Sequence, residues 1–305
     1  MTSCVEKALN SASAENQHIS IMKESMRRVG GLTVAFCSAI GLLLAFSTQA
    51  QIVNLSDGNS TATINTSSQA GMTAWTVNGQ NQLAQQWFWY RLGSSGVASS
   101  IDTIGAPSIT NPDTRHLTTI YTAPSFSVEL DYLLSGGNTA GLVESITISN
   151  RTASALDFHF FQYSNFRLAG ATGSDKIQLG TDVVTGKYNY ALQQNSSGIQ
   201  VQEADLNPSS SHGEANLVTG GTSDTLYKLN HSNPLLLNDL AGPYTGDATW
   251  AFEWDYSTGA NGLIPANSTE IISKTLSLTV PEPSSAAFVG LGLLALGMRL
   301  RRSRH

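Results

Sequence analysis

The sequence predicts an all-β protein: one β-sandwich-like domain of roughly ten to twelve strands, with an N-terminal signal helix and a C-terminal transmembrane helix. Three observations support this prediction. Apolar and polar residues alternate through most of the middle of the chain, and Gly, Asn, Ser and Pro clusters separate the alternating runs. Charged residues make up only 12% of the chain, and neutral polar residues take their place.

The alternation is clearest in "SFSVELDYLL", residues 125–134. Phe126 and Tyr132 fall on one face of a strand there, with Glu129 and Asp131 on the other, so one face is expected to be buried and the other solvated. Similar runs predict further strands in "GLVESITISN", "LDFHFFQYSNF", "GKYNYALQQ", "GIQVQEADL", "DTLYKL", "TWAFEWDY" and "TEIISKTLSLTV".

The sequence also predicts two of the connections between strands. Asn78-Gly79 lies between two β-rich runs and predicts a tight hairpin, since a type I′ turn needs positive φ at both central residues. Residues 231–247 are expected to form a long loop, with a single turn over 235–240.

The charge and cysteine content of residues 51–280 limit the partners and the stabilising bonds that this segment can have. Residues 51–280 hold 8 basic and 18 acidic residues, a net charge of −10, so nucleic acid is not expected as a partner. Both cysteines, Cys4 and Cys37, come before this segment. No disulfide can brace it, and packing and backbone pairing must hold it together.

Residues 1–50 are expected to be a secretory signal peptide. An apolar stretch over 32–46 is followed by small residues suited to cleavage between Ala50 and Gln51. Three basic residues precede it: Lys23, Arg27 and Arg28. Because residues 1–21 are polar and fit poorly before such a signal, the true start is expected at Met22 or Met26.

Residues 281–305 form a second targeting segment. An apolar run over 286–300 would reach about 22 Å as a helix, short of the roughly 30 Å hydrocarbon layer, so it can form a marginal span. Four arginines follow and are expected to stay in the cytoplasm, which places residues 51–280 outside: Arg299, Arg301, Arg302 and Arg304. Pro281, Glu282 and Pro283 precede the run in an extended, accessible break.

These three parts, Pro-Glu-Pro, an Ala/Gly/Leu helix and an arginine cluster, resemble the PEP-CTERM sorting signal, also catalogued as the ice-binding protein C-terminal domain. The resemblance covers about the last 26 residues of the chain. It implies a Gram-negative bacterium, recognition of Pro-Glu-Pro by a membrane protease called exosortase, and passage to the cell surface or exopolysaccharide matrix. It implies nothing about ice for residues 51–280.

Two acidic pairs are the first candidate site. Glu129 and Asp131 repeat the pattern of Glu253 and Asp255, apolar-Glu-apolar-Asp-Tyr. On neighbouring strands, the four carboxylates could hold Ca²⁺ or hydrolyse a glycosidic bond. The favoured alternative is two solvated faces on strands that never meet, with no metal bound.

A second candidate is "WFWYR", residues 87–91. Exposed, Trp87 and Trp89 would stack on sugar rings, but aromatic residues on both faces of a strand favour a buried core strand. Catalytic signatures are absent from the sequence: the histidines are scattered, and neither H-E-x-x-H nor G-x-S-x-G occurs.

The sequence therefore favours an exported, non-enzymatic surface or biofilm-matrix protein without a cofactor, inserted in the cytoplasmic membrane before processing. Its expected partners are the membrane, an exosortase-type protease, and exopolysaccharide or other surface proteins. The alternatives are a secreted carbohydrate-active hydrolase using Glu129, Asp131, Glu253 or Asp255, and a calcium-dependent glycan-binding module.

Overall fold

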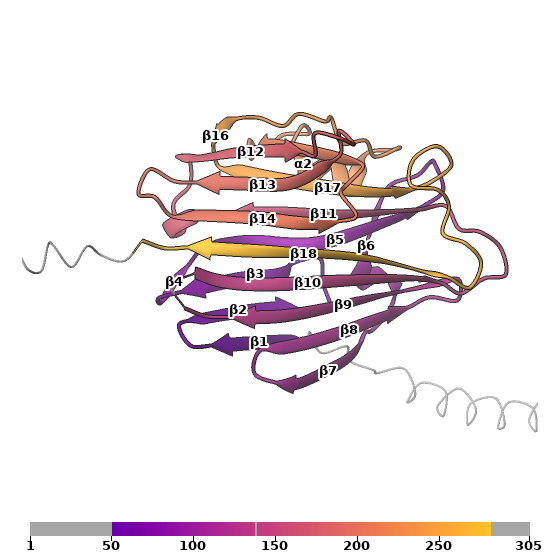
Figure 1. The fold of residues 1–305 in the computed structure, drawn as a ribbon, viewed down its shortest axis with the longest axis horizontal. Helices are drawn as coiled ribbons and strands as arrows, with labels where there is room; N and C mark the ends of the chain where they lie inside the picture. Colours follow the sequence, from indigo (N-terminus) through magenta and orange to yellow (C-terminus); the bar gives the residue numbers. More distant parts are fainter. Residues whose placement is uncertain (1–50, 138, 282–305) are drawn as a thin grey trace, which may run out of the picture. The chain divides into compact units, whose positions relative to one another are not determined.

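The computed structural model describes residues 51–137 and 139–281 (Figure 1). The expected signal segment, residues 1–50, and most of the expected sorting segment, residues 282–305, lie outside this range. No helix among the described residues has the length and apolar character needed to cross a bilayer.

The described residues form two nine-stranded sheets that make a sandwich-like fold. The first sheet has the order β1-β2-β3-β5-β11-β17-β15, with β4 paired to β3 and β6 to β5. All its pairs are antiparallel except β3 with β5. Its strands are β1 (Ile52–Asp57), β2 (Ser60–Asn65), β3 (Gly71–Val77), β4 (Gln80–Asn81), β5 (Leu83–Leu92), β6 (Ser99–Ser100), β11 (Phe158–Phe166), β15 (His212–Leu217) and β17 (Ala248–Tyr256).

The second sheet has the order β16-β12-β13-β14-β18-β10-β9-β8-β7, and all its pairs are antiparallel. The last strand in the chain, β18, lies in the middle of this sheet (Figure 1). The strands are β7 (Ser108–Asp113), β8 (His116–Thr122), β9 (Phe126–Ser135), β10 (Thr139–Asn150), β12 (Asp175–Thr181), β13 (Tyr188–Gln194), β14 (Gln200–Asn207), β16 (Tyr244–Gly246) and β18 (Thr269–Thr279).

The core lies between the two sheets and is rich in aromatic rings. Phe126 of the second sheet packs against Tyr90 and Phe158 of the first, with ring centroids 5.1 and 5.2 Å apart. Even-numbered residues of β11 and β17 therefore point into the core, and odd-numbered residues point to the outer face of the first sheet. Unusually for a two-sheet protein, all nine residues of β11 are buried, so its outer face is covered as well.

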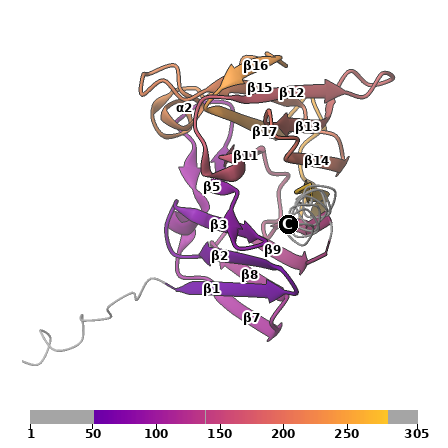
Figure 2. The same ribbon diagram turned by 90° about the vertical axis from the view of Figure 1, so that its left-hand side faces the viewer.

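The cover on that face comes from residues 218–247, between β15 and β17. It contains a seven-residue helix, α2 (Thr225–His231), and a segment without regular structure, residues 232–243, called the strap below. Figure 2 shows α2 in the same part of the domain as β15, β16 and β17. Two short 3-10 helices, η1 (Ile101–Ile104) and η2 (Leu168–Gly170), complete the described elements.

The structure confirms the all-β class and corrects several details. Eighteen strands are present in the described part of the chain, more than expected, because short strands such as β4, β6 and β16 give no alternation to detect. Residues 224–229, expected as a strand, instead lead into and form most of α2. Asn78 and Gly79 do adopt φ of 53° and 79°, but the hairpin they close is only two residue pairs deep.

Candidate functional site

The outer face of the first sheet carries a row of polar and aromatic side chains. The register places His159 opposite Asp255, Phe161 opposite Glu253, and Asn165 opposite Thr249 across β11 and β17. On the next strand, β15, His212 lies opposite Glu253. Alternation along each strand thus brings residues far apart in sequence to one surface.

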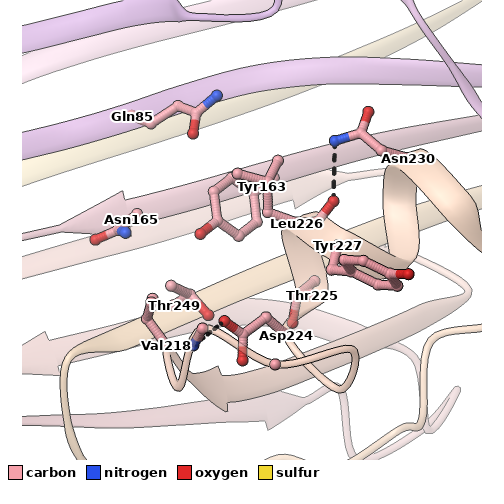
Figure 3. A pocket seen from close by; sticks show the side chains of 12 residues that line it. Gln85, Tyr163, Asn165, Val218, Asp224, Thr225, Leu226, Tyr227, Asn230 and Thr249 are labelled. Carbon is pink, nitrogen blue, oxygen red and sulfur yellow. Dashed lines mark hydrogen bonds between the residues drawn. The ribbon is translucent and has the colours of Figure 1, made fainter.

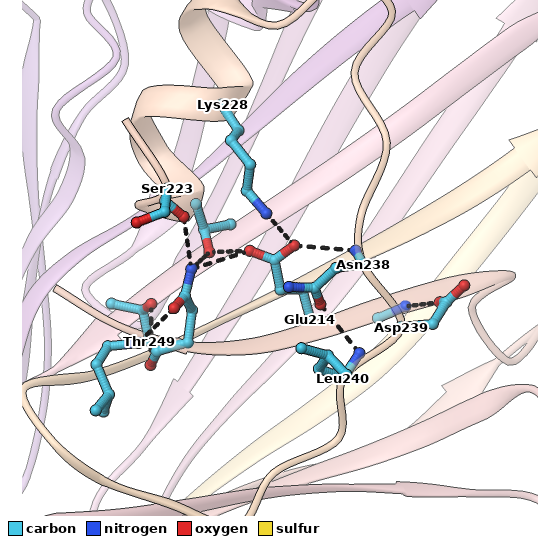
Figure 4. A network of polar contacts seen from close by, with 11 residues as sticks. Glu214, Ser223, Lys228, Asn238, Asp239, Leu240 and Thr249 are labelled. Atoms are coloured by element: carbon cyan, nitrogen blue, oxygen red, sulfur yellow. Dashed lines mark hydrogen bonds and ion pairs between the residues drawn. The ribbon is translucent and has the colours of Figure 1, made fainter. Parts of the chain in front are cut away.

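A buried carboxylate fastens the cover to this surface (Figure 4). Glu214 on β15 is completely buried and pairs with Lys228 of α2. It also accepts hydrogen bonds from Thr225 Oγ1 at 2.6 Å and from the backbone N–H of Asn238 in the strap at 3.0 Å. One side chain therefore holds both α2 and the strap in place.

Further contacts hold the middle of the strap, at Leu235 and Asp239. Arg91 Nη1 donates to the carbonyl of Leu235 at 2.9 Å. His212 Nδ1 lies 3.0 Å from Asp239 Oδ2. Burial alone would lower the pKa of His212, but the hydrogen bond to Asp239, with Glu253 and Asp255 nearby, raises it above its ordinary value.

Beneath this cover lies a cavity of about 340 Å³ (Figure 3). The sheet contributes Gln85, Tyr163, Asn165 and Thr249 to its wall. The cover contributes Val218, Gly220, Gly221, Asp224, Thr225, Leu226, Tyr227 and Asn230. The size falls at the lower end of the range for small-molecule sites.

The cavity wall combines two tyrosines with neutral hydrogen-bonding groups. None of the twelve lining residues is basic, and Asp224 is the only acidic one. Burial raises the pKa of Tyr163 well above its usual value, so its hydroxyl stays protonated and able to donate. Asn165 Oδ1 is buried and has no hydrogen-bond partner among the described residues, and Asn165 forms part of the cavity wall.

Asp224 shapes the rim of the cavity instead of offering a free charge. Its carboxylate accepts the N–H groups of Thr219 and Gly220 at 3.0 and 2.8 Å, and the Thr219 hydroxyl at 2.6 Å. Burial alone would raise the pKa of Asp224, but these hydrogen bonds outweigh it and lower the pKa. Asp224 therefore fixes the 219–224 loop against the start of α2.

Acidic side chains gather elsewhere on the same face, around His159. Its Nδ1 lies 2.9 Å from Glu253 Oε1 and 3.4 Å from Asp255 Oδ1, and its Nε2 lies 3.2 Å from Asp157 Oδ1. His159 and Glu253 are both more than nine-tenths buried. Three carboxylates thus surround one imidazole, an arrangement that differs from a pair flanking an open cleft.

The structure does not bring the two acidic pairs together. Glu129 and Asp131 lie on β9 of the second sheet, while Glu253 and Asp255 lie on β17 of the first. Asp131 contacts His116 Nε2 at 3.0 Å on its own sheet. Within residues 51–137 and 139–281, no three His, Cys, Asp or Glu side chains are arranged to hold a metal ion.

The aromatic strand β5 is buried and does not form an exposed platform. Trp87 Nε1 donates to Ser100 Oγ at 2.9 Å, and Trp89 Nε1 donates to Asn230 Oδ1 of α2 at 3.1 Å. Both indole rings are fully inaccessible to solvent. Their contacts explain this, since one ring lies under η1 and β6 and the other under α2.

The cavity residues were not among those singled out from the sequence. Tyr163 and Asn165 lie in the predicted strand "LDFHFFQYSNF", whose alternation was the available signal. The cavity is closed by α2, over residues whose alternation in sequence predicts a strand. Of the sorting residues, Pro281 is described and exposed just after β18, while Glu282, Pro283 and the arginines fall outside the described range, as do Ala50 and the residues before it.

Comparison with known proteins identifies the C-terminal segment. Residues 279–302 match the family model of the PEP-CTERM protein-sorting motif, which implies export, membrane association and processing by an exosortase. Residues 51–278 are not assigned to a family by this comparison. No curated protein matches the chain in sequence.

Several solved structures resemble the fold. A bacterial glucoamylase complexed with acarbose aligns with 80% of this chain and 35% of its own at 6% identity, with a TM-score of 0.52. The chain thus spans about a third of that enzyme, and the likeness is one of fold. A putative aldose 1-epimerase from Escherichia coli K12 aligns over 76% of this chain and 99% of its own, at 11% identity and a TM-score of 0.49. An aldose epimerase homologue from C. elegans aligns over 76% and 98%, at 9% identity and a TM-score of 0.42.

Proposed function

We propose that this protein is an exported surface or matrix component that binds neutral polysaccharide in the cavity under α2, without chemically changing it. The observation that carries the proposal is the character of the cavity wall. Tyrosine rings and uncharged amide and hydroxyl groups line it, and no basic side chain is among them. Sugar rings present apolar faces and many hydroxyls, which such a wall complements.

Charge supports the neutral class of ligand. Residues 51–280 carry a net charge of −10, and the one ionised group at the cavity is a carboxylate. An anionic polysaccharide would be repelled by the domain and would find no cation in the cavity. The sorting motif at residues 279–302 supports delivery of this domain to the place where cell-surface polysaccharide is found.

A binding experiment tests the proposal. The purified chain is titrated by calorimetry with neutral cello-, xylo- and malto-oligosaccharides and, in parallel, with oligogalacturonate. We expect binding of at least one neutral series and none of the uronate. Asn165→Ala should weaken that binding by about tenfold, since one ligand hydrogen bond is lost.

Gln202→Ala is the matched control, because Gln202 is a half-buried amide on β14 of the other sheet. It should bind as the unaltered protein does. If the Asn165 and Gln202 variants bind equally, the ligand does not occupy this cavity.

The second candidate function is hydrolysis of a polysaccharide by Glu253 and Asp255. Their place on the same outer face as the cavity favours it. Along the strands, Glu253 lies about two residues, or about 7 Å, and Asp255 about four residues, or about 13 Å, from Tyr163. The contacts of both carboxylates with His159 do not favour this function. Release of reducing ends from the same oligosaccharides, abolished by Glu253→Gln, would establish this function in place of simple binding.

A further inference from the structure

A cluster of ionisable side chains lies in the core between the two sheets, whereas the cavity lies on the outer face of the first sheet. Glu144 on β10 and Lys274 on β18 are directly opposite each other across a strand pair. Glu203 comes from β14, on the other side of β18. All three side chains are fully buried, and neither the cavity nor the sorting motif uses them.

Lys274 is held between the two carboxylates. Its Nζ contacts Glu144 Oε2 directly and lies 3.1 Å from Glu203 Oε1. The ring of Phe88 from the first sheet lies on another side, with its centroid 5.5 Å from Nζ. The amine therefore has one acid in contact and a second within proton-transfer distance.

The opposite sheet fixes the position of both acids. Gln86 Nε2 donates to Glu144 Oε2 at 3.4 Å. Gln162 Nε2 and Trp250 Nε1 donate to Glu203 Oε2 at 2.9 and 2.7 Å. Glu203 Oε1 is thereby left to face Lys274, and Glu144 Oε1 has no hydrogen-bond partner among the described residues.

Burial favours the uncharged forms of these groups. It lowers the pKa of Lys274 well below its usual value and raises the pKa of Glu203 to about 7. Two carboxylates and one ammonium would leave an unbalanced negative charge in the dry interior, which is costly. A neutral amine is a nucleophile, and a neutral carboxyl group accepts its attack.

We infer that the Lys274 amine and the Glu144 carboxyl group condense into an amide bond inside the folded domain, with Glu203 transferring the proton. The Nζ lone pair forms the new bond to Cδ of Glu144, and one C–O bond of that carboxyl group breaks. As a neutral carboxyl group, Glu203 gives its own proton to the departing oxygen and takes one from the attacking nitrogen. One water molecule leaves, Glu203 ends as it began, and no oxidant or cofactor takes part.

The surroundings favour condensation over hydrolysis. The fold holds the two groups together, which replaces an encounter between separate molecules and gives a high effective concentration. A neutral amide replaces two ionisable groups where charge is destabilising, and water expelled from the core does not readily return. The bond would join β10 to β18, the strand that leads directly into the sorting motif, in a domain that has no cysteine to form disulfides.

Peptide mapping of the denatured full chain tests this inference. After trypsin digestion, we expect one branched peptide in which residues 116–151, containing Glu144, are linked to a chain uncleaved at Lys274. Its mass should be about 18 Da below the sum of the two peptides, the mass of one water. Complete cleavage after Lys274, with a linear 116–151 peptide of full mass, would overturn the inference whatever the protein binds.

Two variants define the chemistry. Glu203→Gln keeps the side-chain shape and an acceptor for Trp250, and it should give only linear peptides from a protein with unchanged circular dichroism. A branched peptide from this variant would overturn the role given to Glu203. Lys274→Met has no amine and supplies the reference digest, and a branched 116–151 peptide in its digest would show that Lys274 is not the linked residue.

Discussion

Removing the buried carboxylate of Glu214 should release the cover of the cavity. Glu214→Ala deletes the partner of Lys228 and the acceptor for Thr225 and for the Asn238 N–H. Breaking a buried ion pair from one side costs about 3–5 kcal/mol. Because the Lys228 side chain keeps 18% of its exposure and can partly regain water, we expect a loss near the lower end, about 3 kcal/mol.

Urea unfolding followed by tryptophan fluorescence measures this loss. Glu214→Gln retains the shape and one acceptor oxygen, so it should cost less, about 1–2 kcal/mol. Glu129→Ala is the control, since that side chain makes no hydrogen bond or ion pair with the described residues, and its effect should stay within about 0.5 kcal/mol. Amide exchange over 225–238 should rise in the Glu214→Ala protein. Equal stability of the Glu214→Ala and Glu129→Ala proteins would refute the assignment of Glu214 as the fastening residue.

Two further predictions concern backbone packing and pH. At Gly71 an added Cβ would lie 2.3 Å from the Trp87 ring, whereas Gly58, with a similar φ of +55°, has nothing within 4 Å of an added Cβ. Gly71→Ala should therefore destabilise the protein by about 1–3 kcal/mol more than Gly58→Ala in the same urea assay. Equal losses of stability would mean that the positive φ, and not the contact with Trp87, causes the effect. The raised pKa of His212 means that its bond to Asp239 stabilises the strap at low pH and that this contribution is lost as pH rises through the raised pKa. An NMR titration should show the His212 pKa above about 6.5 and its fall in Asp239→Asn, and an unchanged pKa would contradict the pairing.

The strands that the sequence predicted best are those with one solvent-exposed face. Residues 126–135 form β9 with an alternating burial pattern, because the outer side of the second sheet is open to solvent there. In β11 and β17 the alternation in sequence does not become an alternation in burial. Residues 218–247 cover their outer face, and that long-range contact leaves no local signature.

The helix α2 was missed for a different reason. Leu226 and Leu229 are three residues apart, a helical spacing, and Asp224 lies where a helix cap belongs. Over only six residues this spacing cannot be distinguished from a strand. The cavity depends on α2, so the error concealed the site even though the strand carrying Tyr163 and Asn165 was predicted correctly.

The pairing of the acidic motifs could not be read from sequence either. Glu129 and Asp131 share a pattern with Glu253 and Asp255, but strand order decides which residues meet. Strand order in turn depends on connections and on the aromatic core, which no short motif records.

The most direct test of glycan binding in the cavity is an NMR titration of the purified protein with the neutral oligosaccharide that binds most tightly by calorimetry. Saturable amide shifts at residues 163–165 and 218–230, lost in Asn165→Ala, are the predicted result. Shifts confined to the surroundings of His159 and Asp255, with the cavity residues unmoved, would contradict the proposed site.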